Sequence, residues 1–399
     1  MQSQTNASFH KRDIDTYLQT FKRFPITLAD GNGARVRDVE GKEYIDMLAG
    51  IAVNNLGHCH PRVVRAVQEQ AATLMHISNF YTSEPQVRLA ERLTSLSGMK
   101  RIFFSNSGAE SVEGAIKVAR KYAHKNGRGG TIISFEGSFH GRTLATIATG
   151  KEAMQKGFEP IPTGFKKIPH GDMDEVRRAC DQETAAIIIE PVQGEGGIRV
   201  ADKAFLQDLR KHCDEHNIVL IFDEIQCGIA RTGKLFAKDN YDIQPDVMTL
   251  AKGLGSGVPI GAFLSNEKVG DAIDFGDHGT TFGGNPLVCA AGLATLEVIE
   301  EENLTEAAVQ KGQWIREQFA ALNHPDIKDI RGLGLMIGIE FAWETKPLVT
   351  LMLEHGLLAN ATAGNVLRLV PPLTITEADL HQAMAIMKKT IESYTTSHA

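Results

Sequence analysis

The middle of the chain alternates short apolar runs with amphipathic segments, and this alternation limits the possible folds more than any other feature. Residues 131–135, 185–189, 218–222 and 247–250 are apolar runs of strand length, and residues 201–217 have helical spacing. Strand–helix–strand alternation with short connections predicts a parallel sheet covered by helices on both faces. We therefore expect an α/β fold with a large, mostly parallel sheet.

Both ends of the chain depart from this alternation. Residues 33–46 carry β-favouring side chains around a glycine-containing turn, which predicts a hairpin. Asn285 and Pro286 suit the cap and the first turn of a helix. Strand-like runs follow at residues 332–340 and 366–370. These segments indicate a second, smaller α/β domain.

The length of 399 residues allows two or three domains of roughly 150 residues each. We expect residues 51–279 to form the large domain and residues 280–399 to form most of the small domain. Residues 1–50 are expected to be an N-terminal segment that joins the small domain.

Composition and charge exclude several classes of function. The net charge is −7 with no basic stripe, which argues against nucleic acid as a partner. No apolar run approaches the length of about 18 residues expected of a membrane span, and the first 25 residues lack the apolar stretch of a secretory signal. The five cysteines form no CxxC pair, so we expect reduced thiols, a cytoplasmic protein and no metal site.

Three strand ends carry residues that suit one cofactor. Residues 105–110 are small and polar and open a helix, so they could bind an anion such as phosphate, although a serine cap with nothing bound also fits. Asp223 and Lys252 follow two other buried strands, and the ends of parallel strands meet at one edge of a sheet. Pyridoxal phosphate needs an amine for its aldehyde, an acid for its ring nitrogen and donors for its phosphate.

Eight segments, in order along the chain from about Phe24 to the C-terminus, resemble the class III (ω-) aminotransferases of the fold type I pyridoxal-phosphate superfamily. Each segment alone is moderately specific, but eight in order make chance implausible. The matching segments are residues 50–58, 105–110, 138–143, 190–197, 223–226, 250–255, 278–286 and 365–372.

The resemblance implies a site for pyridoxal phosphate. Lys252 would carry the aldehyde carbon and Asp223 would hold the ring nitrogen, and both are expected to be catalytic. Phe139 and Ile225 would cover the two faces of the ring, and Gln226 would reach the ring hydroxyl.

The phosphate would be held by Ser107, Gly108 and Ala109 of one subunit and by Thr281 of its neighbour. The resemblance therefore implies a homodimer with shared active sites.

The resemblance also implies a substrate site that takes two substrates in turn. Arg142 would bind the α-carboxylate of the donor, and Arg368 would bind the α-carboxylate of 2-oxoglutarate. Glu195 would pair with Arg368 while the donor is bound, and Thr280 would lie beside the substrate. Ile51 stands where ornithine-specific members typically carry a tyrosine, which favours an acylated donor, N-acetylornithine.

Alternative functions are also compatible with parts of the sequence. The amino donor could be another ω-amino compound in place of N-acetylornithine: succinylornithine, succinyl-diaminopimelate, ornithine, acetyl-lysine or 4-aminobutyrate. A dinucleotide-dependent dehydrogenase would need a G-x-G-x-x-G turn after a strand, and the glycines at 253–257 and 332–334 do not have that spacing. A non-catalytic binding protein would be favoured by loss of Lys252 or Asp223, but both are present.

Overall fold

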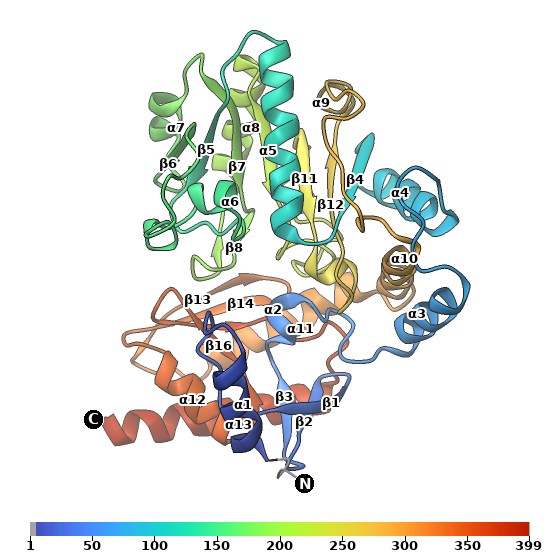
Figure 1. Ribbon diagram of the computed structural model, residues 1–399. Helices are drawn as coiled ribbons and strands as arrows, with labels where there is room; N and C mark the ends of the chain where they lie inside the picture. Colours follow the sequence, from blue (N-terminus) through green and yellow to red (C-terminus); the bar gives the residue numbers. More distant parts are fainter. Residues whose placement is uncertain (1–4, 399) are drawn as a thin grey trace.

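A seven-stranded sheet forms the centre of the upper part of the molecule in the computed structural model, which describes residues 5–398 (Figure 1). The strand order is β4 (Arg101–Ser105), β12 (Gly261–Ser265), β11 (Val247–Leu250), β10 (Val219–Asp223), β7 (Thr184–Ile189), β5 (Thr131–Phe135) and β6 (Phe165–Ile168). Only β12 runs antiparallel to its neighbours, β4 and β11. The prediction of a large, mostly parallel sheet is confirmed, but β12 was not predicted.

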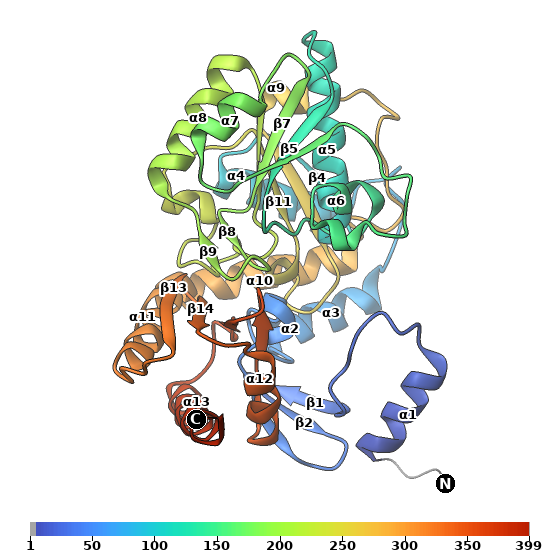
Figure 2. The ribbon, with the colours of Figure 1, turned by 90° about the vertical axis from the view of Figure 1, so that its left-hand side faces the viewer.

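Helices cover both faces of this sheet, as the sequence predicts (Figure 2). On one face lie α5 (Gly108–Lys125), α6 (Leu144–Ala148) and α9 (Glu267–Gly270), and on the other lie α7 (Met173–Ala179) and α8 (Lys203–His216). Each face has its own apolar cluster, in which alternate residues of the same strands take part. Because both faces are buried, the strands need side chains that are apolar throughout, which is why they stand out in the sequence.

The lower part of the molecule joins the two ends of the chain. The N-terminal strands β1 (Leu28–Asn32), β2 (Arg35–Asp38) and β3 (Glu43–Asp46) confirm the predicted hairpin, and β3 pairs in parallel with β15 (Leu357–Leu358). A second sheet contains β13 (Ile327–Leu333), β14 (Met336–Phe341), β17 (Val366–Leu369) and β16 (Asn360–Thr362). The helices of this part are α1 (Asn6–Thr16), α11 (Leu304–Ala320), α12 (Lys346–Glu354) and α13 (Glu377–His398).

One strand prediction in this part is wrong. Residues 332–340 do not form a single strand, because a turn at Gly334 and Leu335 divides them between β13 and β14. Gly334 has a φ of 53°, which glycine adopts without strain, and a Cβ there would lie 2.6 Å from the Arg231 carbonyl oxygen. The residue boundaries of the two domains stay a prediction.

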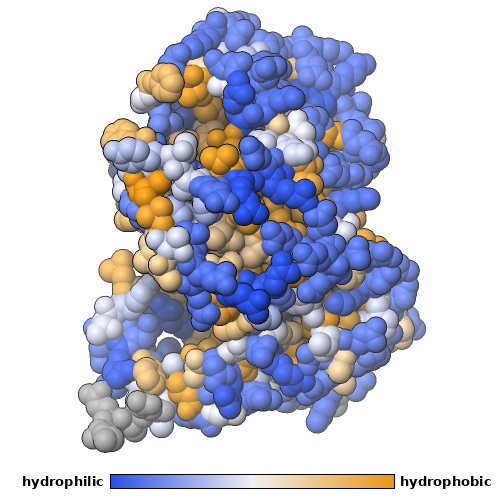
Figure 3. Space-filling model, turned by 90° about the vertical axis from the view of Figure 1, so that its right-hand side faces the viewer, coloured by the Kyte–Doolittle hydropathy of each residue, from blue (hydrophilic) through white to orange (hydrophobic). Residues whose placement is uncertain are grey.

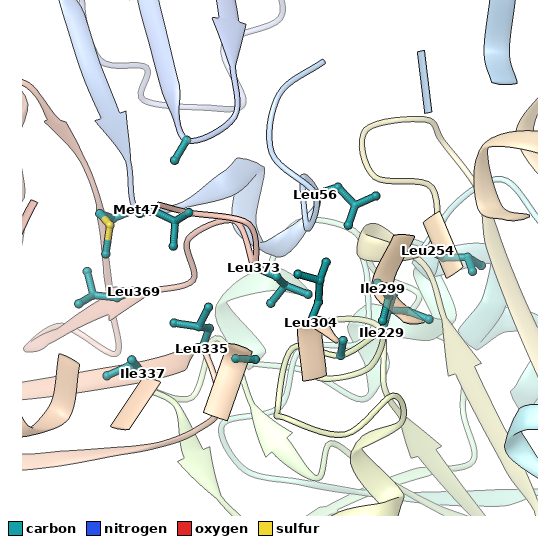
Figure 4. Close-up of a cluster of buried hydrophobic side chains, with 14 of the residues drawn as sticks. Met47, Leu56, Ile229, Leu254, Ile299, Leu304, Leu335, Ile337, Leu369 and Leu373 are labelled. Carbon is teal, nitrogen blue, oxygen red and sulfur yellow. The ribbon is translucent and has the colours of Figure 1, made fainter. Parts of the chain in front are cut away.

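The largest apolar core lies between the two parts of the molecule. Figure 4 shows side chains from distant segments meeting there, among them Met47, Leu254, Ile299 and Leu369. Helix α10 (Pro286–Glu301) packs beside α3 (Pro61–Thr73) and α4 (Glu84–Ser97), and Asn285 caps α10 as predicted. Among residues 5–398, no helix is both long and apolar enough to span a membrane.

Candidate active site

A cavity of about 440 Å³ lies at the carboxyl edge of the large sheet. Loops that follow β4, β5, β7, β10 and β11 line it, together with residues 257–260 before β12. Ligand pockets commonly have a volume of about 300–1,000 Å³, so a cofactor with part of a substrate fits. The cavity brings together nine of the predicted site residues: Ser107, Gly108, Ala109, Phe139, Arg142, Asp223, Ile225, Gln226 and Lys252.

One end of the cavity is formed by the N-terminus of α5. Ser107 caps this helix, and its Oγ accepts a hydrogen bond from the Glu110 N–H at 3.2 Å. The N–H groups of Gly108 and Ala109 donate to no protein group in the described part of the chain. A Cβ at Gly108 would lie 2.9 Å from Ile225, so a larger residue would displace the side chain beside it. Free N–H groups at the positive end of an 18-residue helix suit a phosphate.

Lys252 lines the cavity. It follows Thr249 by three residues, and Thr249 pairs with Asp223 on the neighbouring strand, so Lys252 and Asp223 lie at the same edge of the sheet. Its φ is 40°, a conformation that side-chain-bearing residues rarely adopt and that clusters at functional sites. Burial lowers the pKa of Lys252, and the positive charge of Arg368 lowers it further. No hydrogen bond or ion pair joins its Nζ to another described residue, so the amine is free to react.

Asp223 ends β10 and is held from both sides. Its Oδ1 accepts hydrogen bonds from the Ile225 N–H at 3.0 Å and from Thr249 Oγ1 at 3.1 Å. Its Oδ2 lies 2.6 Å from His140 Nδ1. Burial by itself would lower the pKa of His140, but the hydrogen bond and the charge of Asp223 outweigh burial, so the pKa is raised. The aspartate is therefore oriented by a buried imidazole.

The two predicted arginines lie in different surroundings. Arg142 is exposed, with its guanidinium carbon 5.5 Å from the centre of the Phe139 ring, and it forms no ion pair with a described residue. Arg368 is buried and forms an ion pair with Glu195. It also donates to Gln226 Oε1 at 3.4 Å, and Gln226 lines the cavity. Arg368 thus contacts a residue of the cavity, although neither Arg368 nor Glu195 is among those that line it.

Burial alone would raise the pKa of Glu195, but the charge of Arg368 and its hydrogen bond outweigh burial, so the pKa is lowered. The ion pair therefore keeps Glu195 charged at neutral pH.

Thr280 and Thr281 do not line the cavity of their own chain. Thr280 Oγ1 accepts a hydrogen bond from Asn106 Nδ2 at 3.3 Å, and Asn106 does line it. Thr281 is exposed and lies in a segment next to His76, whose ring centre is 5.4 Å from that of Phe282. Thr281 is therefore accessible to a second molecule.

Sequence reasoning did not assign four polar residues of this site: Asn106, His140, Glu190 and Thr249. Asn106, His140 and Glu190 lie inside segments that carry the family resemblance, which was the available signal. Thr249 lies within an apolar strand, and nothing around it in the sequence marks it.

The donor set fits pyridoxal phosphate. The cavity offers an anion site at α5, a carboxylate at Asp223 and an amine at Lys252 whose lowered pKa favours the neutral form. These are the three groups that the cofactor needs for its phosphate, its ring nitrogen and its aldehyde.

Comparison with known proteins agrees with this chemistry. Residues 17–391 match the family described as aminotransferase class-III. The acetylornithine aminotransferase of Methanocaldococcus jannaschii is 53% identical over 90% of this chain and 92% of its own length.

Solved structures give the same result. A crystal structure of the ornithine aminotransferase from Toxoplasma gondii, described with PLP at its active site, superposes with a TM-score of 0.96 at 33% identity, over 99% of this chain and 96% of that one. The acetylornithine aminotransferase of Elizabethkingia anophelis superposes with a TM-score of 0.87 at 35% identity, over 98% of this chain and 100% of that one. The chain therefore belongs to the class III aminotransferases, the pyridoxal-phosphate-dependent family that its sequence resembles.

Proposed function

We propose that this protein moves the distal amino group of N-acetylornithine to 2-oxoglutarate, giving N-acetylglutamate semialdehyde and glutamate. The observation that carries this proposal is the contrast between Arg142, which is exposed and pairs with no carboxylate of residues 5–398, and Arg368, which is buried and masked by Glu195. While Arg368 is masked, Arg142 is the arginine of the cavity lining that can bind a donor carboxylate. A donor held in this way directs its other end toward Lys252.

Pyridoxal phosphate, when bound, supplies an electrophilic aldehyde and a ring that withdraws electrons from the carbon that loses a proton. Lys252 would act as the nucleophile and afterwards as the group that carries the proton, because it lines the cavity and burial lowers the pKa of its amine. Asp223 would hold the proton on the ring nitrogen, and His140 orients Asp223. Phe139 and Ile225, which line the cavity, would hold the ring, and the N-terminus of α5 would hold the phosphate.

The two substrates are distinguished by the state of Arg368. The donor has one carboxylate, which binds to Arg142 while Glu195 neutralises Arg368. 2-Oxoglutarate has two carboxylates, and its α-carboxylate replaces Glu195 on the guanidinium of Arg368. Arginine suits this exchange, because its planar fork binds one carboxylate as well as another.

An acylated donor is favoured by a short segment from the N-terminal part of the chain that reaches the cavity. This segment is α2 (Ala49–Ala52), from which the next residue, Val53, lines the cavity. Val53 and Ile51 are aliphatic and offer no group that would bind a free α-ammonium. An N-acetyl group carries no charge, so it needs no such partner. The 53% identity to a relative named acetylornithine aminotransferase supports the same donor. We propose that the reaction serves arginine biosynthesis in the cytoplasm.

We propose a homodimer in which Thr281 reaches the phosphate of the neighbouring subunit. Near Thr281 the exposed fractions of Phe80, Tyr81 and Phe282 are 93%, 71% and 61%. Asn79 Nδ2 donates to the Thr280 carbonyl oxygen at 3.1 Å, so the two segments are neighbours. The connection between α3 and α4 lies on the side seen in Figure 3, where hydrophobic side chains reach the surface between hydrophilic ones. Exposed apolar surface of this kind favours association with another protein surface.

The test is a comparison of amino donors with the purified, pyridoxal-phosphate-loaded protein. N-acetylornithine, N-succinylornithine, ornithine, N-acetyl-lysine, N-succinyl-diaminopimelate and 4-aminobutyrate are each supplied with 2-oxoglutarate, and glutamate formation is measured. We expect the highest kcat/KM with N-acetylornithine. A higher value with another donor would replace the proposed substrate, and no glutamate with any donor would overturn the proposed activity.

A further inference from the structure

Glu190 is a buried carboxyl group at the cavity for which the reaction described above has no use. It follows β7 directly and is only 5% exposed. Its Oε2 accepts a hydrogen bond from the Phe139 N–H at 3.1 Å, and its Oε1 accepts one from the Gly194 N–H at 3.3 Å. Burial raises the pKa of Glu190 to about 7, although the charge of His140 opposes that rise. The protein therefore keeps an ionisable group where its charge is disfavoured.

The two backbone groups that Glu190 binds belong to different parts of the site. Phe139 follows β5 and lies under the guanidinium of Arg142. Gly194 begins the tip of a short hairpin formed by β8 (Val192–Gln193) and β9 (Arg199–Val200), and the next residue in this tip is Glu195. A Cβ at Gly194 would lie 2.4 Å from Gln226 Oε1, so this tip fits tightly against the cavity wall.

We propose that Glu190 is a positioning residue that fixes the Phe139 segment and the hairpin tip to one carboxyl group, and so sets how well Glu195 masks Arg368. This inference rests on the proposed function, since masking matters only if the enzyme alternates between two substrates. A loosened tip would leave Arg368 more available, and glutamate would then compete better with N-acetylornithine as the amino donor.

Glutamine is a sharp probe of this role, because it matches glutamate in shape but has only one acceptor oxygen. In Glu190→Gln one of the two N–H groups would face an amide NH₂ and lose its bond. A buried N–H group without an acceptor is unfavourable, so one of the two segments should move or loosen.

Glu224 offers a matched control. It is also a fully buried carboxyl group after a strand of the same sheet, and burial raises its pKa to about 8. It accepts hydrogen bonds from two backbone N–H groups, those of Ala237 at 2.5 Å and Lys238 at 2.7 Å. It is not among the residues that line the cavity. Glu224→Gln therefore removes one of a similar pair of bonds, away from the hairpin tip.

The first measurement needs no activity. Hydrogen exchange of the cofactor-free protein should be faster in residues 136–142 or 191–198 of Glu190→Gln, whereas Glu224→Gln should affect residues 235–240. Unchanged exchange in both segments of Glu190→Gln would overturn the proposal.

The second measurement is the ratio of kcat/KM for glutamate to kcat/KM for N-acetylornithine as amino donors. We expect this ratio to rise about fivefold in Glu190→Gln and to stay the same in Glu224→Gln. The double variant Glu190→Gln, Glu195→Gln should show no further rise over Glu195→Gln alone. An unchanged ratio in Glu190→Gln would show that the residue only stabilises the fold and would overturn the proposal. Failure of the wild-type protein to use N-acetylornithine would instead overturn the proposed function, and the exchange experiment would still test the positioning.

Discussion

Arg142 and Arg368 carry the same charged group in opposite surroundings. Arg142 lies exposed against the Phe139 ring and has no carboxylate partner among the described residues. Arg368 is 1% exposed, is neutralised by Glu195, and also donates to Asn360 Oδ1 at 2.6 Å. The first arginine can take up a carboxylate without displacing a protein group, whereas the second must first lose one.

This difference explains how one cavity can serve two substrates of different charge. A buried guanidinium without a counter-charge is strongly unfavourable, so Arg368 needs a carboxylate at all times, either from Glu195 or from a substrate. Arg142 is solvated and can stay unpaired between substrates. The masked arginine is therefore the one that distinguishes the two half-reactions, and the free arginine serves as the general anchor.

Removal of the buried arginine should have the largest effect. Arg368→Ala leaves Glu195 without its partner and removes the binding group for the α-carboxylate of 2-oxoglutarate. We expect kcat/KM for 2-oxoglutarate to fall about 100-fold or more, because truncating one partner of a buried charge pair has large effects. Stopped-flow measurement of the two half-reactions separately would check this. If both half-reactions fell equally, Arg368 would not be specific to the oxo acid.

Removal of the free arginine should have a smaller effect that falls mainly on the donor. In Arg142→Ala we expect kcat/KM for N-acetylornithine to fall about 30-fold, the scale of a charged hydrogen bond. The thermal midpoint of the cofactor-free protein should hardly change, because Arg142 forms no ion pair with another described residue. A loss confined to the oxo-acid half-reaction would show that the roles of the two arginines are exchanged.

Removal of the mask should make the two arginines more alike. Glu195→Gln keeps the size of the side chain but leaves Arg368 with its full charge. The ratio of kcat/KM for glutamate to kcat/KM for N-acetylornithine as amino donors should then rise about tenfold. The reason is that the α-carboxylate of glutamate no longer competes with Glu195. Competition assays with both donors would measure this ratio. An unchanged ratio would mean that Glu195 does not control access to Arg368.

The contrast between local and distant partners also shows how much the sequence could predict. The strands before Asp223 and Lys252 were predicted because buried parallel strands are continuous apolar runs. Strand β12 was missed because its apolar run is only three residues long, from Ala262 to Leu264, and lies between Gly261 and Ser265. For the same reason the lining by residues 257–260 was not predicted.

Pairings between distant residues left no local signal in the sequence. His140 and Asp223 are separated by 83 residues, and Glu195 and Arg368 by 173. The second pairing was expected only through the family resemblance, and the first was not predicted. Only the folded sheet brings such side chains together, because each lies at the end of a different strand or in a different part of the molecule.

The smallest expected effect is on how the free energy of unfolding depends on pH. The ion pair between Glu195 and Arg368 should contribute to this dependence, whereas Arg142 should not. The ion pair with Arg368 lowers the pKa of Glu195 in the folded protein, although burial acts in the opposite direction. A carboxyl group whose pKa is lowered on folding stabilises the protein at pH values above its pKa in the unfolded chain, about 4.3. This contribution is lost as the pH falls through the pKa of the group in the folded protein. Urea unfolding of the cofactor-free wild type and of Glu195→Gln should therefore give free energies that differ at pH 6 and converge toward pH 3.

The difference between wild type and Arg142→Ala should stay flat over the same range, because no described carboxylate faces Arg142. A flat difference for Glu195→Gln as well would mean that the ion pair contributes nothing to the folded state, and that Glu195 can leave Arg368 at no free-energy penalty.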